Sequence, residues 1–217
     1  MGGERRGDCL SDNRDMQLAL PEGTSSATLI LEGDRRLTDD EYFEFCAENP
    51  DLNCERTSEG EIVIVPPAGG ESDVRSVEAI STLHQWAMRD GRGRAFGSSV
   101  QFELPDGSAR SPDAAWVSKE RLGSLSKREL QRFPHLVPEF VIEVLSPSDR
   151  LAAAKRKMRL WASNGVELGW LIDGDKRRVH VYRGTAEPRV VTDADSIAGE
   201  GPVEGFVLPL GDIWAGL

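Results

Sequence analysis

The pattern of apolar and polar positions predicts helices that alternate with short strands. Residues 37–51, LTDDEYFEFCAENPD, predict a helix because Thr38 and Glu41 have the spacing of a capping box and Phe43, Cys46 and Ala47 give an apolar stripe. Residues 52–67, LNCERTSEGEIVIVPP, predict a β-hairpin whose turn is SEGE and whose firmer strand is EIVIV.

A second apolar stripe, within residues 69–91, predicts a longer amphipathic helix that Gly91 and Gly93 end. The residues expected on its apolar face are Val77, Ile80, His84 and Ala87. Residues 99–117 then predict two short strands, VQFEL and DAAWV, with a turn at PDGS between them. Residues 118–132 are charged and predict a surface helix or loop.

The segment EFVIEVL, residues 139–145, predicts a buried strand that runs into a helix from about residue 149 to 163. Ser148 or Asp149 is expected to cap this helix, and Asn164-Gly165 to end it.

The C-terminal part predicts more β-structure. ELGWLID and RVHVYRG predict antiparallel strands joined by a turn at GDKR, and the alternation around His180 predicts that its side chain faces solvent or a partner. FVLPLGDIW predicts one more edge strand and a short turn. The chain therefore predicts one α/β domain, a central mixed β-sheet flanked by α-helices with an N-terminal helix and β-hairpin.

Composition fits a single domain of 217 residues with 39% hydrophobic and 29% charged residues. We expect a disordered extension over residues 1–27 and one domain over residues 28–217. No apolar run reaches the roughly 20 residues of a membrane span, and the N-terminus has no secretory h-region, so a cytoplasmic location is expected.

Several other classes of protein are disfavoured. The three cysteines have neither disulfide nor zinc-site spacing, GxSxG is absent, and no Walker or dinucleotide fingerprint predicts a nucleotide cofactor. A net charge of −11 argues against nucleic-acid binding through bulk charge. One basic segment qualifies as a local binding surface, and its residues are Arg150, Lys155, Arg156, Lys157 and Arg159.

Two acids, Asp113 and Glu143, lie at or within predicted strands and among apolar residues. If these strands are neighbours, the two carboxylates can converge, and each then raises the pKa of the other unless a cation intervenes. Mg²⁺ typically binds through one or two carboxylates, and Lys157 on the following helix could reach back to the same place. The alternative is that Glu143 is a buried acid held by a salt bridge or backbone amides, and that Lys157 is a solvated lysine.

The segments SPDAAWV, FVIEVLSPSD, KMRLWASNGVELGWLID and VHVYR resemble the Uma-two family of endonucleases. The resemblance covers roughly residues 28–214 and also includes LTDDEYFEFC and ERTSEGEIVIVPP. This family belongs to the PD-(D/E)XK, restriction-endonuclease-like superfamily. The resemblance implies that superfamily's fold, and hydrolysis of DNA phosphodiester bonds with Mg²⁺, or Mn²⁺ in its place.

By this resemblance, Asp113 corresponds to the aspartate of the PD motif and Glu143 to the acid of (D/E)XK. The carbonyl of Val144 and the carboxylate of Glu78 would be further metal ligands. The superfamily pattern expects a lysine two residues after the acid, where this chain has Leu145. Lys157 occupies the place of a lysine relocated to the following helix, and is expected to position water or offset charge.

The partners expected are DNA and a second copy of the chain. Arg150, Lys155, Arg156 and Arg159 would contact the backbone of the nucleic acid. A homodimer would bring two sites to the two strands of a duplex, by analogy with the superfamily. Two alternatives are a catalytically inactive binding or regulatory module with the same fold, and a phosphodiesterase acting on RNA or a small phosphoester.

Overall fold

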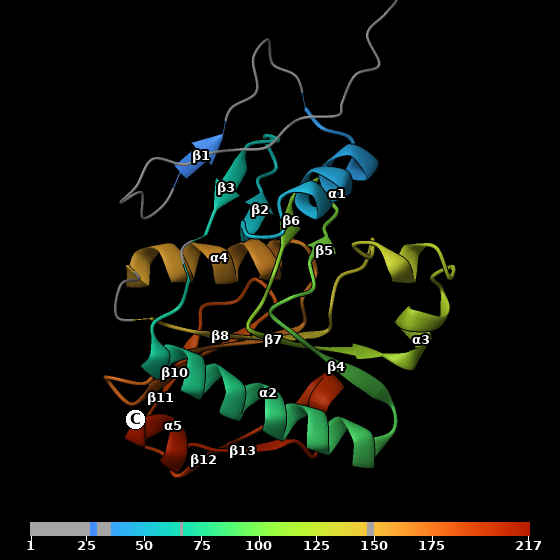
Figure 1. The fold of residues 1–217 in the computed structure, drawn as a ribbon. Coiled ribbons are helices and arrows are strands. Elements are labelled where there is room, and N and C mark those ends of the chain that lie inside the picture. Colours follow the sequence, from blue (N-terminus) through green and yellow to red (C-terminus); the bar gives the residue numbers. More distant parts are fainter. Residues whose placement is uncertain (1–26, 30–35, 66, 147–149) are drawn as a thin grey trace, which may run out of the picture.

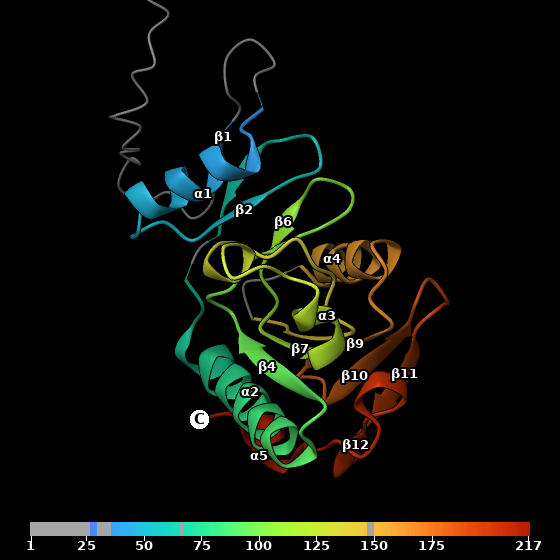
Figure 2. The ribbon, with the colours of Figure 1, turned by 90° about the vertical axis from the view of Figure 1, so that its right-hand side faces the viewer.

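The chain builds two main β-sheets, which the segment between residues 109 and 118 connects (Figures 1 and 2). The structure is a computed structural model that describes residues 27–29, 36–65, 67–146 and 150–217. Apart from Ala27, the expected N-terminal extension lies outside the described residues. The expected helix caps Ser148 and Asp149 lie outside them as well.

The smaller of these sheets is antiparallel and packs against one helix. Its elements are β1 (Ala27–Leu29), α1 (Asp39–Glu48), β2 (Cys54–Arg56), β3 (Ile62–Ile64), β5 (Phe102–Glu103) and β6 (Ala109–Arg110). The strand order is β1-β3-β2-β6-β5. Tyr42 and Phe45 of α1 bury their rings against Ile62 and Ile64 of β3, so a small core joins the helix to the sheet.

The capping and hairpin signals in this region are confirmed, but the predicted apolar stripe of α1 was wrong. Ala47 is exposed and Phe43 and Cys46 are only partly buried, whereas Tyr42 and Phe45 are buried. The Thr38 side chain accepts a hydrogen bond from the Glu41 amide, and the Glu41 side chain accepts one from the Thr38 amide, which completes the capping box. β2 and β3 form the expected antiparallel hairpin. The PDGS turn joins β5 to β6, a two-residue strand that the sequence pattern did not predict.

The larger sheet is mixed and has six strands in the order β11-β10-β9-β8-β7-β4. Its strands are β4 (Gly93–Gly97), β7 (Ala114–Ser118), β8 (Phe140–Val144), β9 (Leu168–Asp173), β10 (Arg178–Arg183) and β11 (Arg189–Thr192). Only β8 and β9 run parallel, and helix α4 (Leu151–Ser163) makes the crossover between them, as a parallel pair requires. The edge strand β4 was not predicted.

Helices cover both faces of the large sheet. Helix α2 (Gly70–Asp90) packs on one face, and α4 packs on the other, between the large sheet and the small one (Figure 1). The remaining elements are α3 (Lys119–Gly123), β12 (Ser196–Ala198), β13 (Val207–Pro209), α5 (Gly211–Ala215) and two short 3₁₀ helices, Glu129–Gln131 and Gly201–Val203. This arrangement confirms the predicted α/β class with a central mixed sheet and flanking helices. No helix in the described ranges is both long and apolar enough to cross a bilayer.

The predicted apolar face of α2 was partly wrong. Val77 is 49% exposed and His84 is also exposed, so these two residues face solvent. The side chains that α2 buries are Ser72, Arg75, Ala79, Leu83, Trp86 and Ala87. Arg75 is tolerated there because its guanidinium pairs with Asp175 and donates to the Ile213 carbonyl, a partner set that an apolar pattern cannot reveal.

Two predictions for the C-terminal part were also wrong. His180 is only 5% exposed, because β10 lies inside the sheet and α4 covers the face to which the imidazole points. The tail forms the expected edge strand, β13, which pairs with β12 in a separate two-stranded ribbon, but the short helix α5 forms where a turn was expected.

Gly93 gives a test of the contact between the edge strand β4 and β7, the strand that begins directly after Asp113. A Cβ atom at Gly93 would lie 2.4 Å from the Trp116 ring and 2.4 Å from the Val117 carbonyl oxygen. Since a backbone atom cannot move aside easily, Gly93→Ala should lower the free energy of unfolding by about 1–3 kcal/mol. Urea unfolding followed by circular dichroism measures this change.

Gly123→Ala is the matched control. Nothing lies within 4 Å of a Cβ at Gly123, which is the last residue of α3. This substitution should change the free energy of unfolding by less than about 1 kcal/mol. Equal effects of the two substitutions would contradict the tight β4–β7 contact.

Candidate active site

Asp113 and Glu143 come from neighbouring antiparallel strands at opposite positions. Ala114 of β7 pairs with Ile142 of β8, so the preceding Asp113 and the following Glu143 continue the same register. Side chains alternate along a strand, and Ala115 and Val141 pack in the core on the α4 side. Asp113 and Glu143 therefore point to the α4 face as well.

A backbone contact holds the Asp113 carboxylate against β8. The amide of Val144 donates a 2.6 Å hydrogen bond to Asp113 Oδ2. Val144 thus contributes its N–H group to the geometry of the site. The expected use of its carbonyl as a metal ligand stays a prediction.

Helix α4 supplies two side chains that engage Glu143. Lys157 and Trp161 are four residues apart, so they lie on one face of the helix. Lys157 Nζ lies 3.0 Å from Glu143 Oε1, and Trp161 Nε1 donates a 2.8 Å hydrogen bond to the same oxygen. The fourteen residues between Glu143 and Lys157 thus fold back to one place, because the crossover helix packs over the strand from which it departs.

Glu55 is a member of this group that sequence reasoning missed. Its Oε1 lies 3.0 Å from Lys157 Nζ, and its Oε2 accepts a 2.8 Å hydrogen bond from Arg110. Glu55 belongs to β2 of the small sheet, so only the packing of the small sheet over α4 brings it here. Its one sequence signal is a charged residue inside a short strand, which predicts no particular partner.

Ser111 connects these residues through its backbone. Its carbonyl accepts a 2.7 Å hydrogen bond from Lys157, and its amide donates a 3.2 Å hydrogen bond to Glu55. Ser111 lies between β6 and Asp113, on the segment that passes from one sheet to the other. Its position fixes the Lys157 ammonium relative to both sheets.

Burial and neighbouring charge shift the pKa values of this group strongly. Glu143 is 8% exposed, and burial raises its pKa to about 8, with Lys157 opposing the change and Asp113 and Glu55 adding to it. Burial raises the pKa of Glu55, but Lys157 and Arg110 outweigh that effect and hold the pKa below its usual value.

Lys157 carries its proton throughout the ordinary pH range. Burial lowers its pKa, yet Glu143, Glu55 and Asp113 together outweigh burial and raise the pKa above its usual value. The carboxylates of Asp113, Glu143 and Glu55 gather close to Lys157, and the like charges of Asp113 and Glu55 contribute to the raised pKa of Glu143. The oxygen donors of Asp113 and Glu143 fit a hard divalent cation, whose ligands are oxygen atoms.

Glu78 lies apart from this group. It is on α2, which packs on the face of the large sheet opposite to α4 (Figure 1). Among the residues that the structure describes, no hydrogen bond or ion pair joins Glu78 to Asp113 or Glu143. Its expected role as a metal ligand remains a prediction without a contact to support it.

The four basic residues expected at nucleic acid surround α4 rather than forming one row. Arg150 is the residue at the N-terminal cap, and Arg156 and Arg159 are exposed. Lys155 is half-buried, and its charge contributes to lowering the pKa of the buried His180, after burial itself. Arg150, Arg156 and Arg159 are all exposed and are therefore the clearest candidates for contact with an external anion.

The order and chemistry of these parts define a class of protein. A mixed sheet with helices on both faces brings two acids to opposite positions of adjacent strands, as in a restriction-endonuclease-like fold. The lysine comes here from the helix that follows the second acid, and not from the strand itself. The family profile of Uma2, described as "Putative restriction endonuclease", matches residues 39–211. The chain belongs to this family.

Comparison with solved structures agrees with the fold. The crystal structure of "a putative nuclease belonging to DUF820 from Anabaena variabilis ATCC 29413" has a TM-score of 0.66 and 23% sequence identity. That match covers 82% of this chain and 98% of the other, and at this identity it shows the fold alone.

A second similarity, to the cryoEM structure of a DrdV–DNA complex, has a TM-score of only 0.35 and 15% identity. It covers 52% of this chain and 9% of that chain, and it carries no argument. No curated protein matches the chain.

The raised pKa of Glu143 predicts how this residue affects stability. The pKa is about 8 in the folded protein and about 4.5 in the unfolded chain, so the folded state binds the proton more tightly. The stabilising contribution is fully present below about pH 4.5 and is lost as pH rises through about 8. Lys157 stays protonated over this pH range, so it does not contribute to the change of the free energy of unfolding with pH.

Glu143→Gln removes this titration and keeps an acceptor for Trp161. The free energy of unfolding of wild type should therefore fall by a few kcal/mol more than that of the variant when the pH is raised from 5 to 8. Urea unfolding at both pH values, with no divalent cation present, measures the difference. Glu48→Gln, an exposed carboxylate on α1, should leave the wild-type pH dependence unchanged. A pH dependence equal in Glu143→Gln and wild type would refute the raised pKa.

Proposed function

We propose that the chain is an endonuclease that hydrolyses DNA phosphodiester bonds with the help of Mg²⁺ or Mn²⁺. The observation that carries the proposal is the meeting of Asp113, Glu143 and Lys157 on one face of the sheet, with the ammonium 3.0 Å from Glu143. Membership of a family described as "Putative restriction endonuclease" supports the same reading.

Asp113 and Glu143 would hold the cation, and the Val144 carbonyl would be the further ligand that the family resemblance implies. Glu78, on the opposite face of the large sheet, is left out of this set. A divalent cation between a carboxylate pair supplies electrostatic stabilisation to the charge that develops on a phosphate. It would also offset the repulsion between the carboxylates and favour the ionised form of Glu143.

Lys157 would act on the reacting atoms. Its ammonium has three N–H donors, so it can orient the attacking water or donate to a phosphate oxygen as negative charge grows there. Glu55 and the Ser111 carbonyl would hold the ammonium in place, each at 3.0 Å or less. Glu55 is thus proposed as a positioning residue. A lysine at position 145 would be held in place by the strand itself, whereas Lys157 on α4 is held in place partly by Glu55.

The partners follow from the same reading. Arg150, Lys155, Arg156 and Arg159 would contact the DNA backbone and contribute affinity more than sequence preference. A homodimer would present two sites to the two strands of a duplex. A cytoplasmic location, where DNA is accessible, completes the proposal.

Cleavage of supercoiled plasmid tests the assigned site. Wild type should nick the plasmid in Mg²⁺ or Mn²⁺ and not in EDTA. Asp113→Asn and Glu143→Gln should each lower the rate at least ~100-fold, because each removes a charge on which the transition state depends. Lys157→Met should lower it comparably, and Glu55→Gln by a smaller factor.

Glu48→Gln and Lys127→Met, both exposed and away from the group, are the charge-matched controls and should cut like wild type. Circular dichroism must show that each variant folds, since Lys157→Met leaves buried carboxylates unpaired. Nicking that survives both carboxylate substitutions would sink the assigned site. A folded wild type that cuts no DNA with either cation would favour the inactive binding module.

DNA affinity tests the contribution of α4. In EDTA, Arg156→Ala and Arg159→Ala should each weaken binding of a labelled duplex about equally for unrelated sequences. Each should also reduce the steepness of log K against log salt by about 0.9, the value for one lost phosphate contact. Fluorescence anisotropy at several salt concentrations measures both quantities. Lys127→Ala removes an exposed charge from another surface and should leave the salt dependence as it is; an unaltered slope in the arginine variants would contradict this surface.

A further inference from the structure

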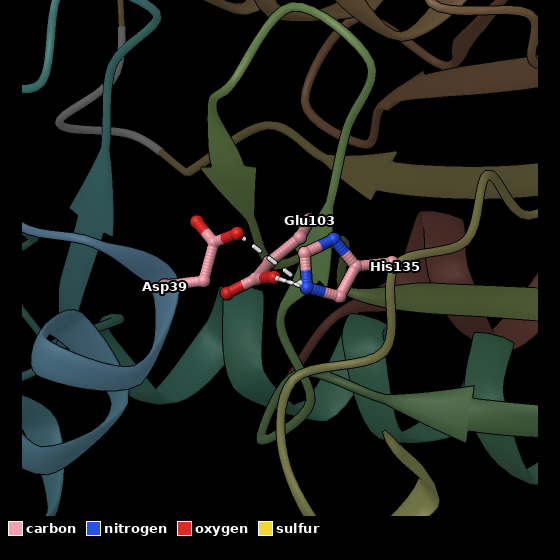
Figure 3. Close-up of side chains that lie close together, drawn as sticks. All are labelled: Asp39, Glu103 and His135. Atoms are coloured by element: carbon pink, nitrogen blue, oxygen red, sulfur yellow. Dashed lines mark ion pairs between the residues drawn. The ribbon is translucent and has the colours of Figure 1, made fainter. Parts of the chain in front are cut away.

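A second group of ligand-type side chains lies in the small-sheet part of the fold, separate from the Asp113–Glu143 pair. Asp39 is the first residue of α1, Glu103 ends β5, and His135 lies on the segment that leads to β8 (Figure 3). One ligand atom from each lies within 4.8 Å of the other two. Among the described residues, this is the one group of three His, Cys, Asp or Glu side chains that meets this distance.

The imidazole turns one nitrogen atom, Nε2, toward both carboxylates (Figure 3). His135 Nε2 is 3.5 Å from Asp39 Oδ2 and 2.5 Å from Glu103 Oε2. Figure 3 shows the three side chains converging from three different segments of the chain. The backbone fixes two of these segments together, because the Glu103 amide donates to the Pro134 carbonyl and Glu103 pairs with His135 in an isolated β-bridge.

Glu103 supplies independent evidence for a ligand. The residue is only 6% exposed, yet its Oε2 has no hydrogen-bond partner among the described residues. The close Nε2 atom of His135 is near this oxygen but does not make a hydrogen bond of acceptable geometry with it. A buried carboxylate oxygen in this state is costly, so it calls for a cation or a proton at that point.

The neighbouring arginines do not occupy the oxygen atoms of Asp39 and Glu103 that face His135. Arg56 donates to Asp39 Oδ1 at 2.6 Å, so it engages the oxygen that points away from His135. The neighbouring Asp40 is paired with Arg128 and Arg132. Burial, then Asp39, raises the pKa of Glu103, and His135 and Arg56 oppose this.

There is also room for a ligand. A cavity of about 110 Å³ is lined by Asp39, Glu103 and His135 together with Phe43 and Phe133, among others. This volume exceeds the roughly 30 Å³ that one water molecule occupies in the liquid. A cation with one or more water molecules fits the space.

We propose that Asp39, Glu103 and His135 form a site for a divalent transition-metal cation of the Zn²⁺ type. An imidazole with two carboxylates suits Zn²⁺, Co²⁺ or Mn²⁺, whereas Mg²⁺ and Ca²⁺ select oxygen ligands only. Metal–ligand bonds of about 2.0–2.2 Å separate tetrahedral ligand atoms by about 3.3 Å, close to the Asp39–His135 spacing. A small rotation of the His135 side chain, which is 54% exposed, opens the shorter spacing to the same value.

A cation at this place would tie α1 to β5 and to the segment that leads to β8. The site differs from the Asp113–Glu143 pair in ligand chemistry, since it contains an imidazole. It also differs in place, because its ligands come from α1, β5 and the segment that leads to β8, and none comes from α4 or the large sheet. The proposal does not depend on the nuclease activity.

Co²⁺, an optical probe for Zn²⁺-type sites, tests the proposal on the full chain in which Asp113→Asn has weakened the other candidate site. Titration should reveal one equivalent of bound Co²⁺ through visible absorption bands of nitrogen and oxygen ligation, without the intense sulfur charge-transfer band that Cys46 or Cys54 would give. Millimolar Mg²⁺ should not displace it. The bound cation should raise the melting temperature, because it binds the folded state.

His135→Ala and Glu103→Gln, added singly, should weaken Co²⁺ binding at least ~10-fold and abolish the thermal shift. His84→Ala, which removes an exposed histidine of α2, is the matched control and should bind like the parent. If His135→Ala does not fold, His135→Gln gives the same comparison with a side chain of similar size. Binding that survives the His135 substitutions, or a folded parent that binds no Co²⁺, would overturn the proposal and leave an imidazole–carboxylate pair.

Discussion

The Lys157 ammonium holds the parts of this fold to one another. It contacts Glu143 of the large sheet, Glu55 of the small sheet and the carbonyl of Ser111 between them, all within 3.0 Å. A buried carboxylate is tolerated only with such a partner, so the two acids and the lysine are interdependent. The candidate active site is therefore also the joint between the two sheets and α4, and changes in its charge act on both chemistry and stability.

Local sequence signals predicted the elements whose causes are local. The Thr38–Glu41 capping box and the β2–β3 hairpin are visible in the sequence because the residues that make them lie within a few positions of each other. The pairing of Asp113 with Glu143 was open to prediction because both acids interrupt apolar strands. Family resemblance, rather than spacing, selected Lys157 from the several basic residues of its helix.

Other features could not be predicted, because their causes are distant in the chain. Glu55 joins the site only through the packing of the small sheet, and Arg75 is buried only because Asp175 and the Ile213 carbonyl receive it. His180 alternates with valines as a half-exposed strand residue would, yet helix α4 covers the second face of its strand. Periodicity reports which residues share a face and cannot report whether another element covers that face.

Two adjacent residues of β2 connect the candidate active site with the group of Asp39, Glu103 and His135. Glu55 turns toward Lys157, and the adjacent Arg56 turns the other way toward Asp39, because consecutive side chains leave opposite faces of a strand. A slip of β2 by one residue against β3 would exchange the two faces and put Arg56 where Lys157 needs a carboxylate. The pairing register of this short strand therefore fixes the charge that each of the two groups receives.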